Sequence, residues 1–416
     1  MMKKQILSAI FFLTITIPVS AETLSLDQCI QLALENNPDL NISEFAWKES
    51  WIAVRQAWSA LSPGASASAS ASNSGPVVSD MNRSWNWSFG GSVTQQFYAP
   101  GLYSRIGLAR ARLASSKFSL TSLRNQIRTL VEDTYLQILT SDTLIGVYNA
   151  NIRAADEQIE KMRQMVELGL KRQSDLLKSE VQRGTFEAQL VRETETLASS
   201  KRSLNIVMGR QPDTKFEILP LPIEQIVIPD FEAALDMLIK NNPQLKQLDS
   251  QIKAQKLSLR IAKEAYLPSI SGSYSYSRRK DALSGLPAFE NDQVNVNLSI
   301  DLFDGFNKLR NVQLSRLALE EAQIDFESAF RDTKDALLNQ YRAMDTQNRL
   351  VKIHQTNLAS AREDYEVVSQ QYAEGFSTIL DLTDAQVSLF ESETSLLQDL
   401  YTRKKIEAEI RRLIGK

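Results

Sequence analysis

The feature that most constrains this 416-residue chain is an internal duplication, marked by two matching breaks between very long helical segments. The first break lies in GLKRQSDLLKSE at residues 169–180, and the second in QYAEGFSTILDLTDAQ at residues 371–386. Each break has a glycine, an aspartate and a leucine in the same places: Gly169, Asp175 and Leu176 match Gly375, Asp381 and Leu382, 206 residues later. A repeat of this size indicates two similar halves, each running out to a tip and back.

Three further landmarks recur at nearly the same spacing, 204 or 205 residues. They are Asn36-Asn37-Pro38 with Asn241-Asn242-Pro243, Pro63 with Pro268, and Gly101 with Gly305. Between the halves, a segment at residues 211–229 contains four prolines and cannot form a continuous helix. We therefore expect a first repeat at 22–210, a connector at 211–229 and a second repeat at 230–416.

The first 21 residues have the organisation of a secretory signal peptide. Lys3 and Lys4 form a basic start, residues 6–17 an apolar core, and Val19-Ser20-Ala21 a small-residue cleavage site. A retained membrane anchor is the alternative, but the apolar run is shorter than the roughly 20 residues that a spanning helix needs. We expect residues 1–21 to be a signal peptide and the remainder to be exported.

Charge and residue usage argue against several classes of function. The net charge is −3 and becomes more acidic once Lys3 and Lys4 are removed, whereas binding nucleic acid needs a basic face. With one cysteine and one histidine, the chain is poor material for metal or nucleophilic catalysis. Cys29 cannot form an intrachain disulfide and does not follow the cleavage site as a lipid anchor would, and we interpret His354 as a packing residue. We predict a protein that is not an enzyme, with no catalytic residue, cofactor or metal site.

Each half also carries two segments in which apolar and polar residues alternate. Trp85, Trp87, Phe89 and Val93 alternate with Asn86, Ser88, Ser92 and Thr94, and Val294, Val296, Leu298, Ile300 and Leu302 alternate with Asn295, Asn297, Ser299 and Asp301. A period of two with one apolar face predicts strands, here as hairpins at about 64–98 and 269–303. Each strand is about ten residues long, which suits a tilted strand in a bilayer. A soluble half-buried sheet is the alternative, but two hairpins at the same place in an exported helical repeat favour the membrane.

The long helical segments carry an apolar stripe with a period of seven. Its members are Val131, Ile138, Ile145, Ile152, Ile159 and Val166 in the first half, and Leu337, Met344, Val351, Leu358, Tyr365 and Tyr372 in the second. A strict heptad repeat predicts left-handed supercoiling against neighbouring helices. At 1.5 Å per residue, an outgoing helix at 103–168 would be about 100 Å long, and the helices at 175–208 and 39–61 about 50 Å and 35 Å.

These lengths predict a long helix paired with two stacked shorter ones in each half, bearing a hairpin at one end. The fold class is therefore mainly α with a small β part. Four strands cannot close a barrel, and an open edge cannot lie in lipid, so the chain must oligomerise. Three copies would give twelve strands, although the strand count alone does not select three over two or four.

Several motifs together resemble the TolC family of outer-membrane efflux and secretion channels over essentially the whole mature sequence. They are the duplicated opening at Ala33 to Pro38 and Leu238 to Pro243, Leu267-Pro268 before a strand, Phe303-Asp304-Gly305 after one, and Tyr372, Gly375 and residues 380–386 at the second tip. The resemblance implies a homotrimer with a twelve-stranded barrel in the outer membrane of a Gram-negative bacterium and an α-helical tunnel through the periplasm. It also implies a periplasmic adaptor (membrane fusion) protein and an inner-membrane transporter as partners at the tips.

Carried over residue by residue, the resemblance assigns roles at the tip turns, 169–175 and 375–381. The constriction would comprise Asp381 and Asp384, one helical turn apart, with Tyr372 and Asp175; the alternative for the two acids is a solvated helix start. The adaptor-docking residues would be Gly169, Leu170, Lys171, Arg172, Ser174, Leu176, Gly375, Phe376, Ser377, Leu380 and Leu382. Ser377 departs from the family members with a well-described closed gate, which have an arginine there that bonds to the tyrosine and to an aspartate. Lys171 and Arg172 are candidates to replace it.

The leading functional hypothesis is a passive conduit in a tripartite efflux or type I secretion system, in contact with outer-membrane lipid and driven by the transporter. The alternative is an exported coiled-coil scaffold or adhesin of the cell envelope. That alternative accounts for the heptads and leaves the amphipathic strands and duplicated tips unexplained.

Overall fold

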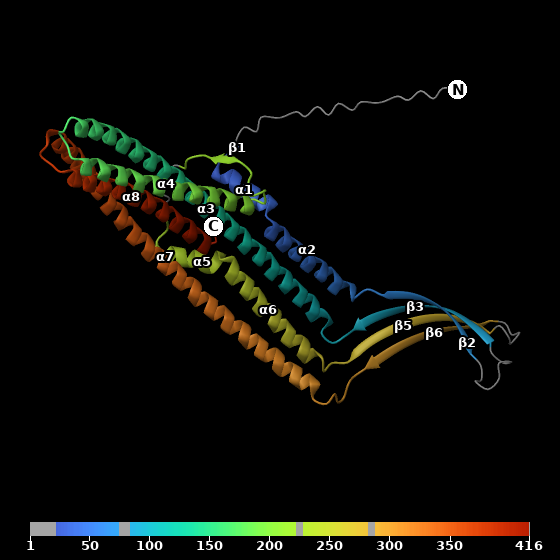
Figure 1. Ribbon diagram of the computed structural model, residues 1–416. Helices are drawn as coiled ribbons and strands as arrows, with labels where there is room; N and C mark the ends of the chain where they lie inside the picture. The colour runs from blue at the N-terminus through green and yellow to red at the C-terminus, as the bar shows by residue number, and fades with distance from the viewer. Residues whose placement is uncertain (1–21, 75–83, 222–227, 282–287, 416) are drawn as a thin grey trace, which may run out of the picture. The chain divides into compact units, whose positions relative to one another are not determined.

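The computed structural model describes residues 22–74, 84–221, 228–281 and 288–415 (Figure 1). The expected signal peptide at residues 1–21 and part of the connector lie outside the described residues. The chain divides into two compact units. We call the first, within Met1–Asn37, Leu130–Gln225 and Val351–Thr402, the tip unit, and the second, within Pro38–Thr129, Ile226–Leu350 and Arg403–Lys416, the strand unit.

The fold is mainly helical with a small β part, as the sequence predicts. The helices are α1 (Leu26–Asn36), α2 (Pro38–Ser59), α3 (Leu102–Glu167), α4 (Gln173–Val207), α5 (Phe231–Asn241), α6 (Pro243–Glu264), α7 (Asn307–Glu374) and α8 (Ile379–Leu413). The strands are β1 (Glu22–Leu24), β2 (Gly64–Ser74), β3 (Ser84–Tyr98), β4 (Phe216–Ile218), β5 (Ser269–Asp281) and β6 (Phe289–Ser299). No described helix is both long enough and apolar enough to cross a bilayer.

The strand unit contains a four-stranded antiparallel sheet in the order β2-β3-β5-β6. The two predicted hairpins, β2 with β3 and β5 with β6, are confirmed, and β3 pairs with β5 to join the repeats (Figure 1). The predicted second hairpin extends too far at its C-terminal end. Strand β6 ends at Ser299, so Ile300 and Leu302 lie beyond the strand, where the chain turns toward Gly305 in the left-handed conformation.

One face of the sheet carries most of the large apolar residues, together with Gln95 and, toward the strand ends, Arg278, Glu290 and Asp292. The other face is mainly polar. Residues directly opposite each other on neighbouring strands share a face, and the register places Ala65, Val93, Tyr274 and Val294 in one row. The large apolar residues of this face are exposed: Trp85, Trp87, Phe89, Val93, Phe97, Tyr274, Tyr276, Val294, Val296 and Leu298. On β3 the alternate polar side chains Asn86, Ser88 and Ser92 are half-buried. The pattern is inverted relative to a sheet that packs its apolar face on a protein core.

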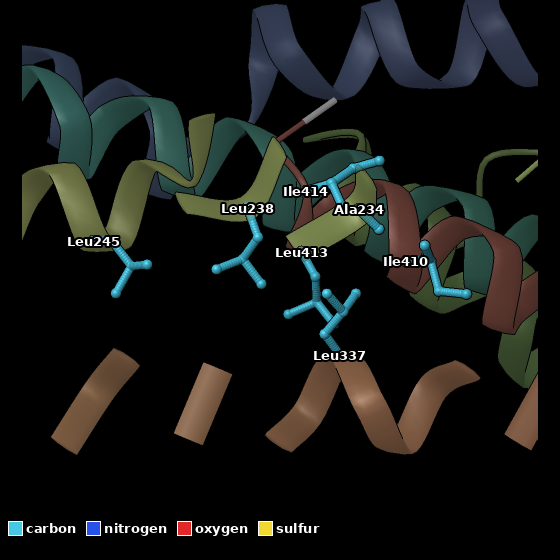
Figure 2. Close-up of a cluster of buried hydrophobic side chains, with 7 residues drawn as sticks. All are labelled: Ala234, Leu238, Leu245, Leu337, Ile410, Leu413 and Ile414. Carbon is cyan, nitrogen blue, oxygen red and sulfur yellow. The ribbon is translucent and has the colours of Figure 1, made fainter. Parts of the chain in front are cut away.

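The helices of the strand unit pack around a core of buried aliphatic side chains (Figure 2). Leu238 of α5, Leu245 of α6, Leu337 of α7 and Ile410 of α8 meet there, and all four are nearly inaccessible to solvent. Leu337 belongs to the predicted heptad stripe. None of the twelve stripe residues is exposed: six are buried and six are half-buried, so the stripe faces neighbouring helices, while its supercoiling stays a prediction.

A junction built in the same way occurs once in each unit, where the Asn-Asn-Pro landmarks lie. In the tip unit Asn37 Nδ2 donates to the Val207 carbonyl at the end of α4, over 3.0 Å. In the strand unit Asn242 Nδ2 donates to the Leu413 carbonyl at the end of α8, also over 3.0 Å. In each repeat, a hydrogen bond thus joins the end of the last helix to the corner asparagine, the residue between the first two helices. The corner asparagine also caps the following helix in the second repeat, accepting from Leu245 N.

Two tyrosines, again 206 residues apart, complete these junctions. In the tip unit the Tyr135 hydroxyl donates to the Leu219 carbonyl over 2.7 Å, beside the parallel pair β1 and β4, and burial raises the pKa of its phenol to about 12. In the strand unit the Tyr341 hydroxyl donates to the Pro229 carbonyl over 2.7 Å. The sequence analysis did not predict β1, β4, α1 or α5. The two strands are only three residues long, and the two helices are short segments that end just before Pro38 and Pro243.

The glycine that ends each last helix gives a direct test of the junction. Gly209 has a φ of +70°, and a Cβ there would collide with the carbonyl oxygen of Asn36. We expect Gly209→Ala to lower the free energy of unfolding by about 2 kcal/mol, because an L-residue is strained at this φ and the backbone oxygen cannot move aside easily.

Thermal unfolding followed by circular dichroism would show a lower midpoint for this variant. Gly184→Ala is the matched control, since Gly184 lies inside α4 and a Cβ added to it would meet nothing within 4 Å. Alanine there favours the helix and should leave the midpoint unchanged or raise it. Equal midpoints for the two variants would show that the junction does not depend on close approach at Gly209.

Candidate functional site

The two tip turns end α3 and α7 with the same hydrogen-bonded motif. At the first, Gly169 N donates to Val166 O over 2.9 Å and Leu170 N to Met165 O over 2.8 Å. At the second, Gly375 N donates to Tyr372 O over 3.2 Å and Phe376 N to Gln371 O over 2.8 Å. The glycines have φ values of +72° and +87°, which identifies both turns as Schellman motifs. The repeated glycines therefore reverse the chain.

A small apolar core lies beneath the tip turns. It comprises Ile159 and Met162 of α3, Leu176 of α4, Tyr372 of α7, and Ile379 and Leu382 of α8. Leu176 and Leu382 are only 6% and 4% exposed. The resemblance placed both leucines on an adaptor-docking surface. Because their side chains are buried in the chain's own core, we correct this assignment: they hold the four helices of the tip together.

Tyr372 occupies the centre of the tip. Its hydroxyl donates to Met162 Sδ over 3.3 Å, and Lys171 Nζ lies 4.1 Å from the centroid of its ring. A cation over an aromatic face is attracted by the ring's quadrupole. Burial raises the pKa of the Tyr372 phenol to about 12, and the negative charge of Asp175 contributes to the rise. Tyr372 is thus a neutral hydrogen-bond donor at any physiological pH.

Ser377, at the position of the arginine described above, makes a different contact. The Ser377 hydroxyl donates to the Val368 carbonyl of α7 over 3.3 Å, which ties the turn back onto its own helix. The cation beside Tyr372 comes instead from Lys171 on the first tip turn. Lys171 was one of the two residues considered as a replacement; Arg172, the other, is exposed.

Asp381 and Asp384 lie at the start of α8, and both are exposed. Asp381 Oδ2 accepts from Thr378 N over 2.8 Å and from the Thr378 hydroxyl over 2.7 Å, while Asp381 N donates to the same hydroxyl over 3.3 Å. This reciprocal pair is a capping box. The Thr378 hydroxyl and amide lower the pKa of the Asp381 carboxyl, so the box persists at neutral pH and weakens as the pH falls through that lowered pKa.

The tip also presents apolar side chains to solvent. Phe376 is 81% exposed, and Leu168, Leu170 and Leu380 are exposed as well. Arg172, Ser174 and the two tip glycines share this exposure, whereas Lys171 and Ser377 are half-buried. Leu168 and the capping residue Thr378 were missed by the sequence reasoning. A large apolar residue directly beside the tip glycine, and a Thr-x-x-Asp pattern at the helix start, were the signals for them.

His354 has a polar partner in addition to the packing role expected for it. Its Nδ1 lies 2.6 Å from Asp399 Oδ2, which joins α7 to α8 within the tip unit. The side chain is half-buried, so both descriptions apply in part: the ring packs between the helices and its nitrogen is hydrogen-bonded.

Comparison with known proteins finds one family whose model matches the chain twice. The family described as outer membrane efflux protein matches residues 29–210 and 234–416. The chain is 23% identical to outer membrane protein TolC of Vibrio cholerae over 416 residues, covering 97% of this chain and 92% of that protein. It is 22% identical over 332 residues to alkaline protease secretion protein AprF of Pseudomonas aeruginosa, covering 78% of this chain and 68% of that protein.

Solved structures share the fold at low sequence identity. A structure of CusC has a TM-score of 0.84 and 16% identity, covering 94% of this chain and 92% of that one. The outer membrane protein VceC from Vibrio cholerae has a TM-score of 0.83 and 16% identity, covering 94% of this chain and 96% of that one.

The capping box at Thr378 predicts a local effect at the second tip turn. Thr378→Val removes the hydroxyl that both caps α8 and donates to Asp381, so the first turn of α8 should open more often. Amides of residues 381 and 382, which donate to the Thr378 hydroxyl and carbonyl, should exchange with solvent deuterium about fivefold faster. Thr394→Val is the control, because its hydroxyl bonds only to carbonyls within α8. Unchanged exchange at 381 and 382 in Thr378→Val would show that the box does not hold the turn.

Proposed function

The chain belongs to the outer membrane efflux protein family and is an outer-membrane channel that extends into the periplasm, and from this premise we propose how it assembles and works. In our proposal three copies form the channel, and substrates pass through it passively. An inner-membrane transporter supplies the energy, and a periplasmic adaptor protein connects the two. The chain itself performs no chemistry on its cargo.

The observation that carries this proposal is the four-stranded sheet whose large apolar side chains are exposed. Exposing so many large apolar side chains to water, among them Trp85, Phe89, Val294 and Val296, is unfavourable. The same side chains are suited to contact with lipid. The edge strands are β2 and β6, and in hydrocarbon their outer backbone groups need partners. Pairing β2 of one copy with β6 of the next supplies them. A coiled-coil scaffold or adhesin gives no reason for such a sheet.

The helices of the strand unit support the same pairing of copies. α2 exposes an apolar stripe at Ile42, Phe45 and Ile52, and the first part of α7 exposes Leu314, Leu317 and Ile324. Both sets have helical spacing, so each forms one face. In Figure 1, α2 and α7 lie at opposite sides of the strand unit, with α3 and α6 between them. An α2 face against a neighbour's α7 face would cover both stripes.

The size of the passage argues against two copies. Two copies would give eight strands, and a barrel of about eight strands has an interior that side chains fill. Three copies and twelve strands are the smallest closed arrangement that leaves an open lumen. The family resemblance also favours three.

The exposed tip residues are the proposed adaptor-docking surface. Leu170, Phe376 and Leu380 offer apolar contact area, with Arg172, Ser174 and the half-buried Lys171 and Ser377 beside them. Leu168 is added, and the buried Leu176 and Leu382 are excluded. An exposed apolar patch rimmed by polar residues is a common mark of a protein-binding surface. The names of the relatives mention both protease secretion and outer-membrane efflux, so the cargo class stays open.

Single-channel recording in planar bilayers tests the conduit itself. The purified, detergent-extracted oligomer should give discrete conductance steps. A preparation that is folded by circular dichroism and inserts into bilayers without conductance steps would overturn the proposal.

The two acids at the start of α8 give a second prediction. With threefold symmetry, Asp381 and Asp384 would form two stacked rings of carboxylates at the narrow periplasmic entrance, and such rings attract cations. We expect Asp381→Asn with Asp384→Asn to reduce cation selectivity, measured as the reversal potential in a salt gradient. Asp213→Asn, an exposed acid after α4, is the control and should leave it unchanged. Equal reversal potentials in all three proteins would remove the two aspartates from the pore.

A further inference from the structure

The polar face of the β2-β3-β5-β6 sheet has a composition that bears on selectivity. Strand register groups its residues into rows. Three rows are Thr94, Ser273 and Asn295; Ser66, Ser92, Ser275 and Gln293; and Ser68, Gly90, Ser277 and Asn291. Two more are Gln96, Ser271 and Asn297, and the pair Ser269 and Ser299. Every member of these five rows, all within the described strands, is a serine, threonine, asparagine, glutamine or glycine.

The uncharged rows extend over most of the height of a membrane. From Ser269 to Ser277 the strand is about 27 Å long at roughly 3.4 Å per residue, which gives about 20 Å of height at the tilt of about 40° that strands have in such barrels. The apolar band of an outer-membrane barrel is about 25 Å tall. The next residue of β5 on the same face is Arg279, which stands opposite Ser88. On β5, the first charged side chain on this face is therefore Arg279, at the end of the rows farthest from the helices.

Some of these polar side chains bond to one another. Ser66 Oγ and Ser92 Oγ are 2.9 Å apart across β2 and β3, and Gln293 Nε2 donates to Asn295 Oδ1 of the next row over 2.9 Å. A hydroxyl both donates and accepts, and an amide does the same through its two ends. A face of hydroxyl and amide groups can therefore contact the water around a passing cation or anion without preferring either charge.

We infer that the membrane-crossing section of the channel is electrically neutral, so that it does not sort cargo by charge. This rests on the proposed function, since the polar face lines the lumen only if the apolar face contacts lipid. Rings of charged side chains are what give a pore its charge preference. The preference must then arise in the helical part, where the chain places its carboxylates and cations.

The local potential inside the sheet section can be measured with a cysteine. The only natural cysteine, Cys29, is fully buried, and burial raises the pKa of its thiol to about 11, so it does not react. Ser273→Cys in lipid nanodiscs is treated with an anionic and with a cationic methanethiosulfonate reagent, and modification is followed by mass. The ratio of the two rates, divided by the same ratio for a small thiol in solution, should be within about twofold of one.

Two further variants make the result interpretable. Tyr274→Cys is the neighbour on the apolar face and should resist both reagents, because lipid covers it. Ser273→Cys combined with Ser275→Asp adds a carboxylate two residues away and should favour the cationic reagent by about tenfold. Ser275→Cys repeats the measurement if Ser273→Cys does not fold.

A tenfold bias at Ser273→Cys would overturn the inference, and so would reaction at Tyr274→Cys with none at Ser273→Cys. These outcomes are separate from failure of the conduit. If the labelling rates are as expected but no conductance steps appear, only the conduit is rejected. If conductance steps appear but Ser273→Cys reacts tenfold faster with one reagent than with the other, only the neutral passage is rejected.

Discussion

An unpaired strand edge cannot lie in hydrocarbon, and the rest of this structure depends on that constraint. The four-stranded sheet exposes apolar side chains on one face and ends in two edge strands, β2 and β6. A soluble protein would bury the apolar face and protect the edges, whereas here both are left for the membrane and for other copies of the chain. The exposed stripes on α2 and on the first part of α7 have the same character. These surfaces are what we expect of a chain that forms one sector of a larger ring.

Each repeat is closed by a junction that does not depend on neighbouring copies. An asparagine side chain bonds the last helix, a tyrosine hydroxyl bonds the connecting segment, and a glycine allows close approach. These contacts satisfy backbone carbonyls at helix ends that would otherwise be buried without donors. They explain why the Asn37 and Asn242 landmarks recur, and the structure adds two further matched pairs, Gly209 with Gly415 and Tyr135 with Tyr341.

The parts predicted from sequence are those with a long periodic signal. Twelve heptad positions, two alternating hairpins and two tip glycines were identified because each pattern repeats and then recurs in the second half. Strands β1 and β4 were missed because three residues carry no period, and their pairing joins segments almost two hundred residues apart. At the tip, Leu176 and Leu382 each follow an acid at a helix start and so look like surface residues, yet the helix turns them onto the core. The contact of Lys171 with Tyr372 depends on how two turns meet, which spacing does not reveal.

The central claim is that one chain supplies a third of a closed ring. Native mass spectrometry of the protein released from outer membranes in mild detergent measures this directly. We expect an assembly of three chains and no folded single chain, because a lone sector would leave its strand edges and apolar stripes uncovered. A stable, folded monomer in that detergent, with the sheet still protected from hydrogen exchange, would contradict the claim.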